Sequence, residues 1–413
     1  MKKLMCLMLA AMLLLCGCTG KKAPQTREDG AQILQGRREK AEAHMRYMMS
    51  VLWQPEQDLV YSTDVGSLGV EMDDPSDVLH LYADRVYSGM PYTHGSGAAE
   101  TFLSYGQKDE NGVYQMSGLT AELLSGGGGT KANNIARLSN DCADAVSWAW
   151  ATVGNSFSFT LTGNMTASRG CLPVGTYKTS DGTYKKTRDL CKENGEEVMF
   201  EAYALLQMAD GVVTYNGAGH AMMISQNNPV RTKNGIDPEE SYVLVHEQFT
   251  GNTREELTRV DEETGLTVYC LGGVDRKYTY SQLFKKGYLP ITIKELIDPA
   301  EVPPIDIVDS VKKPSADTIT SGSLNSLHKI AAVTVRITDS TGAVVQEATC
   351  FTREAEHNMF RMETFTEPIE QSVMQGSLDV ASLTAGKYRC VTQCLMGIGE
   401  TVTVRDFEFE IQK

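Results

Sequence analysis

The sequence predicts an α+β domain followed by a smaller all-β domain, in a chain of 413 residues that is long enough for two or three domains. Three observations support this prediction. Helical patterns come first, between residues 37 and 208, and apolar strand-like runs follow them up to residue 293. Residues 298–323 are proline-rich and polar, which is typical of a linker. Residues 324–413 contain runs that alternate apolar and polar positions, which is typical of paired strands.

The first 18 residues predict an export signal. Two lysines precede an apolar run from Leu4 to Leu15, which has the length of a signal peptide and is too short to span a membrane. The Leu-Cys-Gly-Cys that follows resembles a bacterial lipobox, in which the last cysteine is acylated. This resemblance implies a lipid anchor at Cys18 and an extracytoplasmic location on the membrane surface. An ordinary cleaved signal peptide is the alternative.

Residues 19–55 are expected to form a polar tether, to about residue 36, and then one helix. An approximately helical stripe of apolar residues runs through residues 37–53, and Pro55 is expected to end it.

Residues 56–297 contain the remaining elements of the α+β domain. We expect helices over residues 77–86, from Cys142 to about Gly154, and over 196–208. A glycine-rich loop at 125–130 and a long polar segment at 155–196 separate them. The expected strands cover 221–225, 242–249 and 266–271, and a short helix and a closing strand lie within 278–293.

Residues 324–413 predict an all-β sandwich that is similar to immunoglobulin-like modules. Strand patterns flank an Asp-Ser-Thr-Gly turn at 339–342 and recur at 382–395 and 401–412. We see no cluster of reactive residues here. This domain is therefore expected to bind a polymer or a protein, or to act as a spacer.

The net charge of −15 argues against nucleic acid as a partner, because no basic stripe is present to follow a phosphate backbone. The Ser-Gly-Gly-Gly-Gly-Thr loop has no lysine of a phosphate-binding loop, and no cofactor motif is visible. Seven cysteines remain after the first 18 residues, without a Cys-x-x-Cys pair, so we expect no metal site. A disulfide between Cys171 and Cys191 is open from sequence alone.

Cys142 is the first candidate for chemistry. Asn140 and Asp141 are both good helix N-cap residues. Cys142 and Val146 then begin an apolar helical stripe, so a buried structural cysteine is one reading. The other reading is a nucleophile, because the free N–H groups and the dipole of a first helical turn favour a thiolate and can hold an oxyanion.

A nucleophilic thiol needs a base, and two histidines lie on strand-like runs. His220 follows a Gly-Ala-Gly turn at the head of one run, and His246 lies at the end of the next. We expect His220 to be the base and His246 to orient it. Glu247 and Gln248 are alternatives to His246, because a slip of one residue in a strand reverses the face of each side chain.

Three segments together resemble the NlpC/P60 family of papain-like cysteine peptidases. They are Gly-Met-Pro-Tyr-Thr-His-Gly at 89–95, Asp-Cys-Ala-Asp-Ala-Val at 141–146 and Gly-His-Ala-Met-Met-Ile-Ser at 219–225. The resemblance covers roughly residues 85–250 and implies hydrolysis of peptide bonds in peptidoglycan stem peptides, often between D-glutamate and a diamino acid. It also implies Cys142 as the nucleophile, His220 as the base, His246 as the orienting residue, and contacts of Tyr92, Asp141 and Asp144 with the substrate.

The chain departs from the family pattern in two ways. Ala143-Asp144 replaces the Ser-Gly that follows the family's cysteine, and the spacings from Tyr92 to Cys142 and from Cys142 to His220 are long. Two different functions are therefore also open. One is an amidase of the CHAP or transglutaminase-like type, for which Asp237 is available as the third residue. The second is a surface lipoprotein that binds wall peptides or a partner through a degenerate site.

Overall fold

The structure is a computed structural model of mixed α/β type with more strand than helix. It describes residues 27–62, 78–93, 97–125, 138–154, 165–167, 170–180, 185–249, 257–351, 359–365 and 378–412. The expected lipid anchor at Cys18 and most of the glycine-rich loop lie outside these residues. Among the described residues, no helix is both long enough and apolar enough to cross a membrane.

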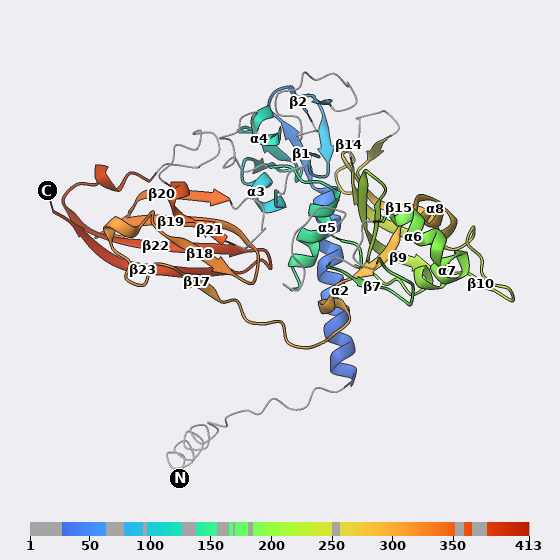
Figure 1. The fold of residues 1–413 in the computed structure, drawn as a ribbon. Coiled ribbons are helices and arrows are strands. Elements are labelled where there is room, and N and C mark those ends of the chain that lie inside the picture. The colour runs from blue at the N-terminus through green and yellow to red at the C-terminus, as the bar shows by residue number, and fades with distance from the viewer. Residues whose placement is uncertain are drawn as a thin grey trace, which may run out of the picture.

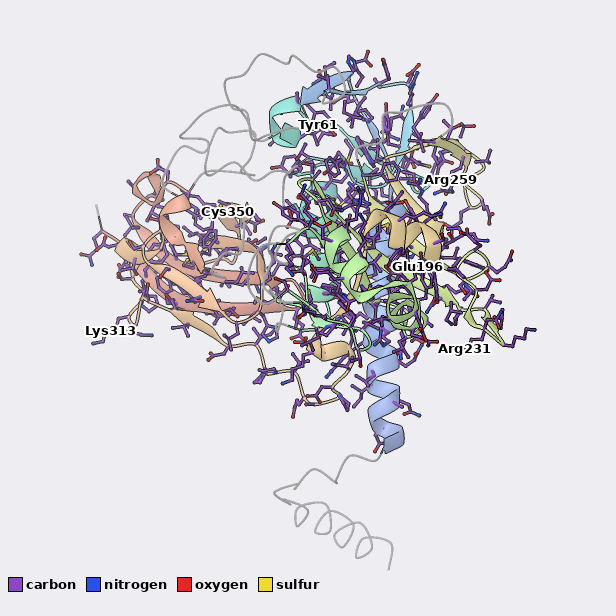
Figure 2. The ribbon with its side chains drawn as sticks, turned by 45° about the vertical axis from the view of Figure 1, so that its right-hand side comes forward. Tyr61, Glu196, Arg231, Arg259, Lys313 and Cys350 are labelled. Carbon is purple, nitrogen blue, oxygen red and sulfur yellow. The ribbon has the colours of Figure 1, made fainter. Side chains whose placement is uncertain are left out.

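The central sheet has six antiparallel strands in the order β15-β12-β9-β8-β16-β7. Figure 1 shows helices α2 and α5 on one side of this sheet and α6, α7 and α8 on the other. In Figure 2 Glu196 marks the start of α7, and Arg231 marks the short β10–β11 hairpin beside it. The elements are β7 (Leu172–Pro173), β8 (Gly211–Tyr215), β9 (Gly219–Asn228), β10 (Arg231–Thr232), β11 (Gly235–Ile236), β12 (Tyr242–Gln248), β15 (Gly272–Thr279), β16 (Leu289–Thr292), α2 (Arg27–Ser50), α5 (Cys142–Ala151), α6 (Thr187–Asn194), α7 (Glu196–Ala204) and α8 (Tyr280–Lys286).

A second six-stranded sheet, in the order β13-β14-β4-β1-β6-β5, lies beyond the C-terminal end of α2. Its strands β1 and β6 are parallel, as are β14 and β4. A separate hairpin of β2 and β3 and two one-turn helices accompany it. The elements are β1 (Leu52–Pro55), β2 (Leu59–Ser62), β3 (Val78–Leu81), β4 (Val86–Ser88), β5 (Gln107–Lys108), β6 (Tyr114–Met116), β13 (Thr258–Val260), β14 (Thr267–Cys270), α3 (Ala99–Leu103) and α4 (Ala121–Ser125).

The C-terminal part consists mainly of strands, with a four-stranded sheet β20-β19-β22-β23, a three-stranded sheet β17-β18-β21 and short 3₁₀ helices between strands. The buried Arg405 joins the two sheets, because its guanidinium donates to both carboxylate oxygens of Asp309 at 2.7 and 2.8 Å. The strands are β17 (Ile307–Asp309), β18 (Ser323–Ser326), β19 (Ile330–Asp339), β20 (Val344–Phe351), β21 (Met359–Arg361), β22 (Gly386–Met396) and β23 (Thr401–Ile411).

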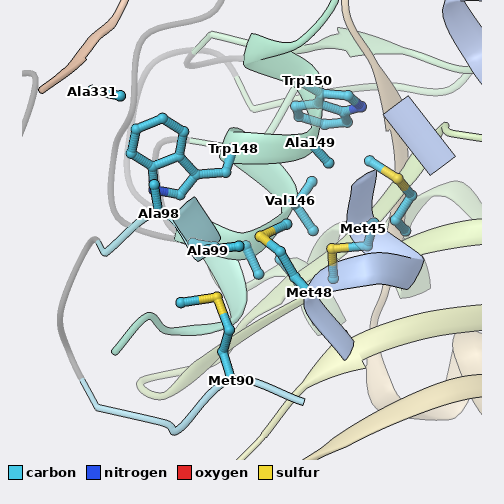
Figure 3. Close-up of a cluster of buried hydrophobic side chains, with 14 of the residues drawn as sticks. Met45, Met48, Met90, Ala98, Ala99, Val146, Trp148, Ala149, Trp150 and Ala331 are labelled. Atoms are coloured by element: carbon cyan, nitrogen blue, oxygen red, sulfur yellow. The ribbon is translucent and has the colours of Figure 1, made fainter. Parts of the chain in front are cut away.

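Helix α5 lies in the centre of the largest hydrophobic core. All of its residues except Asp144 are buried, which is expected for a helix that is apolar all round. Figure 3 shows its Val146 facing Met45 and Met48 of α2. The indole of Trp150 donates from Nε1 to the carbonyl of Ala209, two residues before β8, at 2.8 Å. Neighbours on several sides therefore fix the position of α5.

The C-terminal part also contacts α5. The Nζ atom of Lys329 lies 3.8 Å from the centre of the Trp148 ring, and the Lys329 side chain is buried. Lys40 of α2 donates to the carbonyl of Ile398 at 3.2 Å. These contacts join the all-β part to the two helices that cover the central sheet.

Three expectations about elements are wrong. Residues 77–86 do not form a helix, because Val78–Leu81 pair with β2 and Val86–Ser88 pair with β1 and β14. Helix α2 begins at Arg27, inside the expected tether, and ends at Ser50, so that Pro55 belongs to a strand. Residues 307–309, inside the expected linker, form β17 and pair with β18.

Candidate active site

Cys142 is the first residue of α5. Asp141 is the N-cap residue, and its carboxylate accepts a hydrogen bond from the backbone N–H of Asp144 at 2.8 Å. The helix does not need the backbone N–H of Cys142 for its own hydrogen bonds, because the first N–H groups of a helix have no acceptor within it. The site therefore has a thiol and a free backbone donor at the positive end of a buried helix.

The Gly-Met-Pro-Tyr segment lies directly beside this helix end, although 50 positions separate Tyr92 from Cys142. Tyr92 and Asn140 form a parallel bridge, in which the N–H of Thr93 donates to the carbonyl of Asn140 at 3.3 Å. Burial and the neighbouring side chains of Cys142, Asp141 and Asp144 raise the pKa of the Tyr92 hydroxyl. The long insertion therefore does not separate this segment from the nucleophile.

His220 lies near the start of β9 and contacts both Cys142 and Glu247. Its Nε2 atom is 2.6 Å from Oε2 of Glu247. The Cys142 side chain lies close enough to the ring to raise its pKa. The His220 side chain keeps 23% of its surface exposed, so a ligand can reach it. Cysteine, histidine and glutamate thus form a row of neighbouring side chains, in which the histidine is hydrogen-bonded to the glutamate.

The protonation of His220 is strongly perturbed. Burial alone would lower the pKa of this ring, but the neighbouring Cys142 and Glu247 side chains outweigh burial and raise the pKa to about 10. The imidazolium form therefore dominates at neutral pH. A protonated ring beside the thiol is the state that a cysteine nucleophile with a histidine partner requires.

Glu247 is the residue that holds His220. Its side chain is 3% exposed. Its second oxygen, Oε1, accepts from the Tyr278 hydroxyl at 2.8 Å and forms an ion pair with Nη1 of Arg276 at 2.9 Å. Burial would raise the pKa of this carboxyl, but the hydrogen bond to His220 and the charges of His220 and Arg276 lower it. Glu247 is therefore ionised, and both of its carboxylate oxygens have partners.

The expectation that His246 orients His220 is wrong. His246 is fully buried on the opposite face of β12, where its Nε2 lies 2.7 Å from Oε1 of Glu42 on α2. The backbone N–H of Asp275 lies 3.3 Å from its other ring nitrogen. The physical reason is the alternation of β12, which sends His246 and Glu247 to opposite faces.

Gln248 and Asp237, the remaining candidates for the third residue, lie away from His220. The amide of Gln248 donates to the carbonyl of Met90 at 2.7 Å. The carboxylate of Asp237 accepts from the backbone N–H groups of Glu239 and Glu240 at 3.1 and 3.2 Å, in the turn before β12. Neither residue contacts His220 in the described part of the chain.

Sequence reasoning missed Arg276, Tyr278 and Tyr288. Arg276 and Tyr278 lie on β15, which pairs with β12, so the strand that follows the histidine strands supplies the partners of Glu247. The Tyr288 ring lies edge-on to His220, with 6.4 Å between ring centres. One sequence signal was available for Arg276 and Tyr278. They are two residues apart, so on a strand they point to the same face, where they can meet an acidic residue of a neighbouring strand.

No group of three or more His, Cys, Asp or Glu side chains with metal-binding geometry occurs among the described residues. The seven cysteines from Cys142 onward are all free thiols, including Cys171 and Cys191. Burial raises the pKa of Cys171 and raises that of Cys191 to about 12. These two thiols therefore remain protonated at neutral pH.

Comparison with known proteins gives no family. No protein-family model matches the chain, and no curated protein matches it. One solved structure with detectable similarity is described as a tetra-tandem repeat in the extending region of a large adhesion protein. It is 13% identical, the match covers 48% of this chain and 40% of that chain, and the TM-score is 0.16. A likeness this low carries no argument about fold or function.

Proposed function

We propose that this protein is a cysteine peptidase that hydrolyses peptide bonds in peptidoglycan stem peptides. The observation that carries the proposal is the row Cys142–His220–Glu247 at the N-terminus of a buried helix. A thiol, a histidine and a group that orients the histidine are the three parts that nucleophilic cysteine catalysis needs. Glu247 takes the place that sequence reasoning gave to His246.

In the first step the Cys142 thiolate attacks the carbonyl carbon of the scissile amide. The carbonyl oxygen becomes an oxyanion, which the backbone N–H of Cys142 stabilises. We assign the second donor to the Tyr92 hydroxyl, because the Tyr92 backbone pairs with Asn140, two residues before Cys142. The imidazolium of His220 then gives its proton to the leaving nitrogen, so that the amine departs and a thioester remains on Cys142.

In the second step water hydrolyses the thioester. Neutral His220 removes a proton from the water, and the hydroxide adds to the thioester carbonyl. The Cys142 thiolate leaves, and His220 is again an imidazolium. Glu247 keeps the ring oriented and stabilises its positive charge in both steps, while Tyr278 and Arg276 hold Glu247 in place.

The substrate class and the location rest on the sequence. The three segments around Tyr92, Cys142 and His220 resemble those of NlpC/P60 peptidases, which implies a papain-like catalytic domain and stem peptides as substrate. The lipobox-like start implies a lipid anchor at Cys18 on the outer face of the membrane. The strand patterns of residues 324–413 resemble those of immunoglobulin-like sandwiches, and we propose that this domain binds wall polymer or a partner, or spaces the enzyme.

Digestion of purified peptidoglycan tests the proposal. The wild-type protein should release stem-peptide fragments whose masses, measured by mass spectrometry, identify the cleaved bond. Cys142→Ala should release none, whereas the control Cys270→Ala, which removes a half-buried thiol from β14, should match the wild type. Absence of release from walls of several stem types would favour the binding lipoprotein, and fragments cut between sugar and peptide would favour an amidase.

A further inference from the structure

Basic side chains gather on the outer surface of helices α6 and α8. Residues 185–194 and 280–286 together contain six basic and two acidic residues, in a chain whose net charge is −15. One of the two acids, Glu193, pairs with Lys185 at 3.1 Å. The other five cations are exposed, and we call them the basic surface: Lys186, Arg188, Lys192, Lys285 and Lys286.

The two segments are adjacent in the fold although they lie far apart in the sequence. Asn216, in the turn between β8 and β9, joins them. Its side-chain oxygen accepts from the backbone N–H of Arg188 at 3.0 Å, and its amide nitrogen donates to the carbonyl of Lys286 at 3.2 Å. Gly287 packs so closely on α6 that an added Cβ would lie 2.5 Å from the Cα atom of Arg188. The basic surface is therefore assembled by the fold, which is why the sequence shows no basic stripe.

The charges of the basic surface are largely not neutralised. Lys285 lies 3.9 Å from Glu239, but the two side chains are 72% and 68% exposed, and such a pair contributes little in water. In the part of the chain that the structure describes, the other four cations form no ion pair. Charges of one sign that lie close together repel each other, and an anion that binds to them relieves the repulsion. The basic surface therefore favours an anionic partner.

The arrangement of the cations favours a polymer as this partner. They are spread over two helices, so anionic groups that repeat along a chain can meet several of them at once, whereas one small anion cannot. A lipid surface is less suitable, because the N-terminal end of α2, which leads to the expected anchor at Cys18, does not lie on this surface. Figure 1 shows α6 and α8 side by side, on the face of the central sheet that α2 does not cover.

We propose that the basic surface binds a polyanion whose phosphodiester or carboxylate groups repeat along an extended chain. The cations neutralise these groups and release the counterions of the polymer, so the affinity depends steeply on salt. This binding site lies on the α+β domain and is separate from any ligand of the C-terminal part. The inference goes beyond the proposed reaction, because binding at this surface requires neither Cys142 nor His220.

Binding of two synthetic polymers tests the inference. The probes are linear polyphosphate and poly-L-glutamate of similar length, labelled with a fluorophore and titrated with the protein. We expect at least one of them to bind, with an affinity that falls at least about twentyfold between about 50 and about 200 mM NaCl, which is the loss for about three neutralised charges. The polymer that binds more tightly identifies whether phosphate or carboxylate groups are recognised.

Neutralising three cations should remove most of this binding. The variant is Lys186→Gln/Arg188→Gln/Lys286→Gln, which changes only exposed side chains. It leaves in place the backbone groups of Arg188 and Lys286 that bond to Asn216, so the fold should be kept. At about 50 mM NaCl it should bind the preferred polymer at least about tenfold more weakly than the wild type does, and its affinity should depend less steeply on salt.

The matched control is Lys312→Gln/Lys313→Gln/Lys387→Gln, which removes the same charge from exposed side chains of the C-terminal part and should bind like the wild type. No binding of either polymer, an affinity that salt does not change, or an equal loss in the control would overturn the inference. Tighter binding of a DNA duplex than of both polymers would also overturn it, since the surface would then fit a nucleic acid. Polymer binding by a protein that releases no peptide from the wall would keep the inference and reject only the peptidase.

Discussion

Replacing Glu247 by glutamine removes the negative charge beside His220 and keeps a side chain of the same shape. The hydrogen bond at 2.6 Å is made to an ionised and almost fully buried carboxylate. Such a bond contributes about 1.5–3 kcal/mol, and one pKa unit corresponds to about 1.4 kcal/mol. Glu247→Gln should therefore lower the pKa of His220 by about 1–2 units, from about 10 to about 8–9.

The consequence is a shift in the alkaline limb of the pH profile. The active form needs an imidazolium, so the rate of peptide release should fall near pH 10 in the wild type and near about pH 8–9 in Glu247→Gln. NMR titration of the histidine ring nitrogens gives the same pKa values without a substrate. The matched control is Glu42→Gln, which removes the carboxylate 2.7 Å from His246 on the other face of β12 and should leave the limb near pH 10. An alkaline limb that Glu247→Gln does not move would refute the assignment of Glu247.

Three further predictions concern stability. The pKa of His220 is raised from 6.5 to about 10, so its protonated ring stabilises the fold fully below pH 6.5. This stabilisation is lost as the pH rises through about 10. The Tm of the wild type should therefore fall more between pH 7 and 10 than the Tm of His220→Gln. Asp309→Ala leaves Arg405 buried without its counter-charge and should lower the free energy of unfolding by about 3–5 kcal/mol in a denaturant titration; a loss below about 1 kcal/mol would contradict this. Gly89→Ala should destabilise by more than about 1 kcal/mol, because Gly89 has φ +94° and an added Cβ would lie 3.0 Å from the Met49 carbonyl oxygen; an unchanged Tm would contradict this.

Local patterns in the sequence were enough to predict β9 and β12 of the central sheet, β14 of the second sheet and strands of the C-terminal part, but not β8 or β15. The runs at 221–225, 242–249 and 266–271 lie within or around β9, β12 and β14. The prediction of a helix over 77–86 was wrong because Val78–Leu81 is a strand whose side chains alternate between buried and more exposed. Its partner, β2, lies earlier in the sequence, so a local pattern does not reveal the pairing. A short apolar run does not distinguish strand from helix without its partner.

The candidate site was predictable in part. Cys142 and His220 could be proposed because a helix N-terminus and the head of a strand are recognisable in sequence. Glu247 could be named only as one of three neighbours, because β12 shifts register beside it and sequence does not locate that irregularity. Arg276 and Tyr278 become visible only when β15 is known to pair with β12.

The Gly-Met-Pro-Tyr segment has a structural explanation that sequence did not provide. Gly89 adopts a left-handed conformation where the chain passes the end of α2, and its N–H donates to the Val51 carbonyl at 2.9 Å. The turn directs Tyr92 to the strand bridge with Asn140, two residues before Cys142. The turn at Gly89 therefore helps to place Tyr92 beside the nucleophile.

Selective alkylation tests the central claim, that Cys142 is a nucleophile activated by His220, most directly. The chain carries its own controls, because Cys171, Cys390 and Cys394 are buried thiols whose pKa burial raises. With limiting iodoacetamide at about pH 6.5, peptide mapping should show Cys142 labelled at least about a hundredfold faster than these thiols, and His220→Gln should remove that advantage. Labelling of Cys142 no faster than the buried thiols, or a rate unaffected by His220→Gln, would contradict the account and return Cys142 to the hydrophobic core.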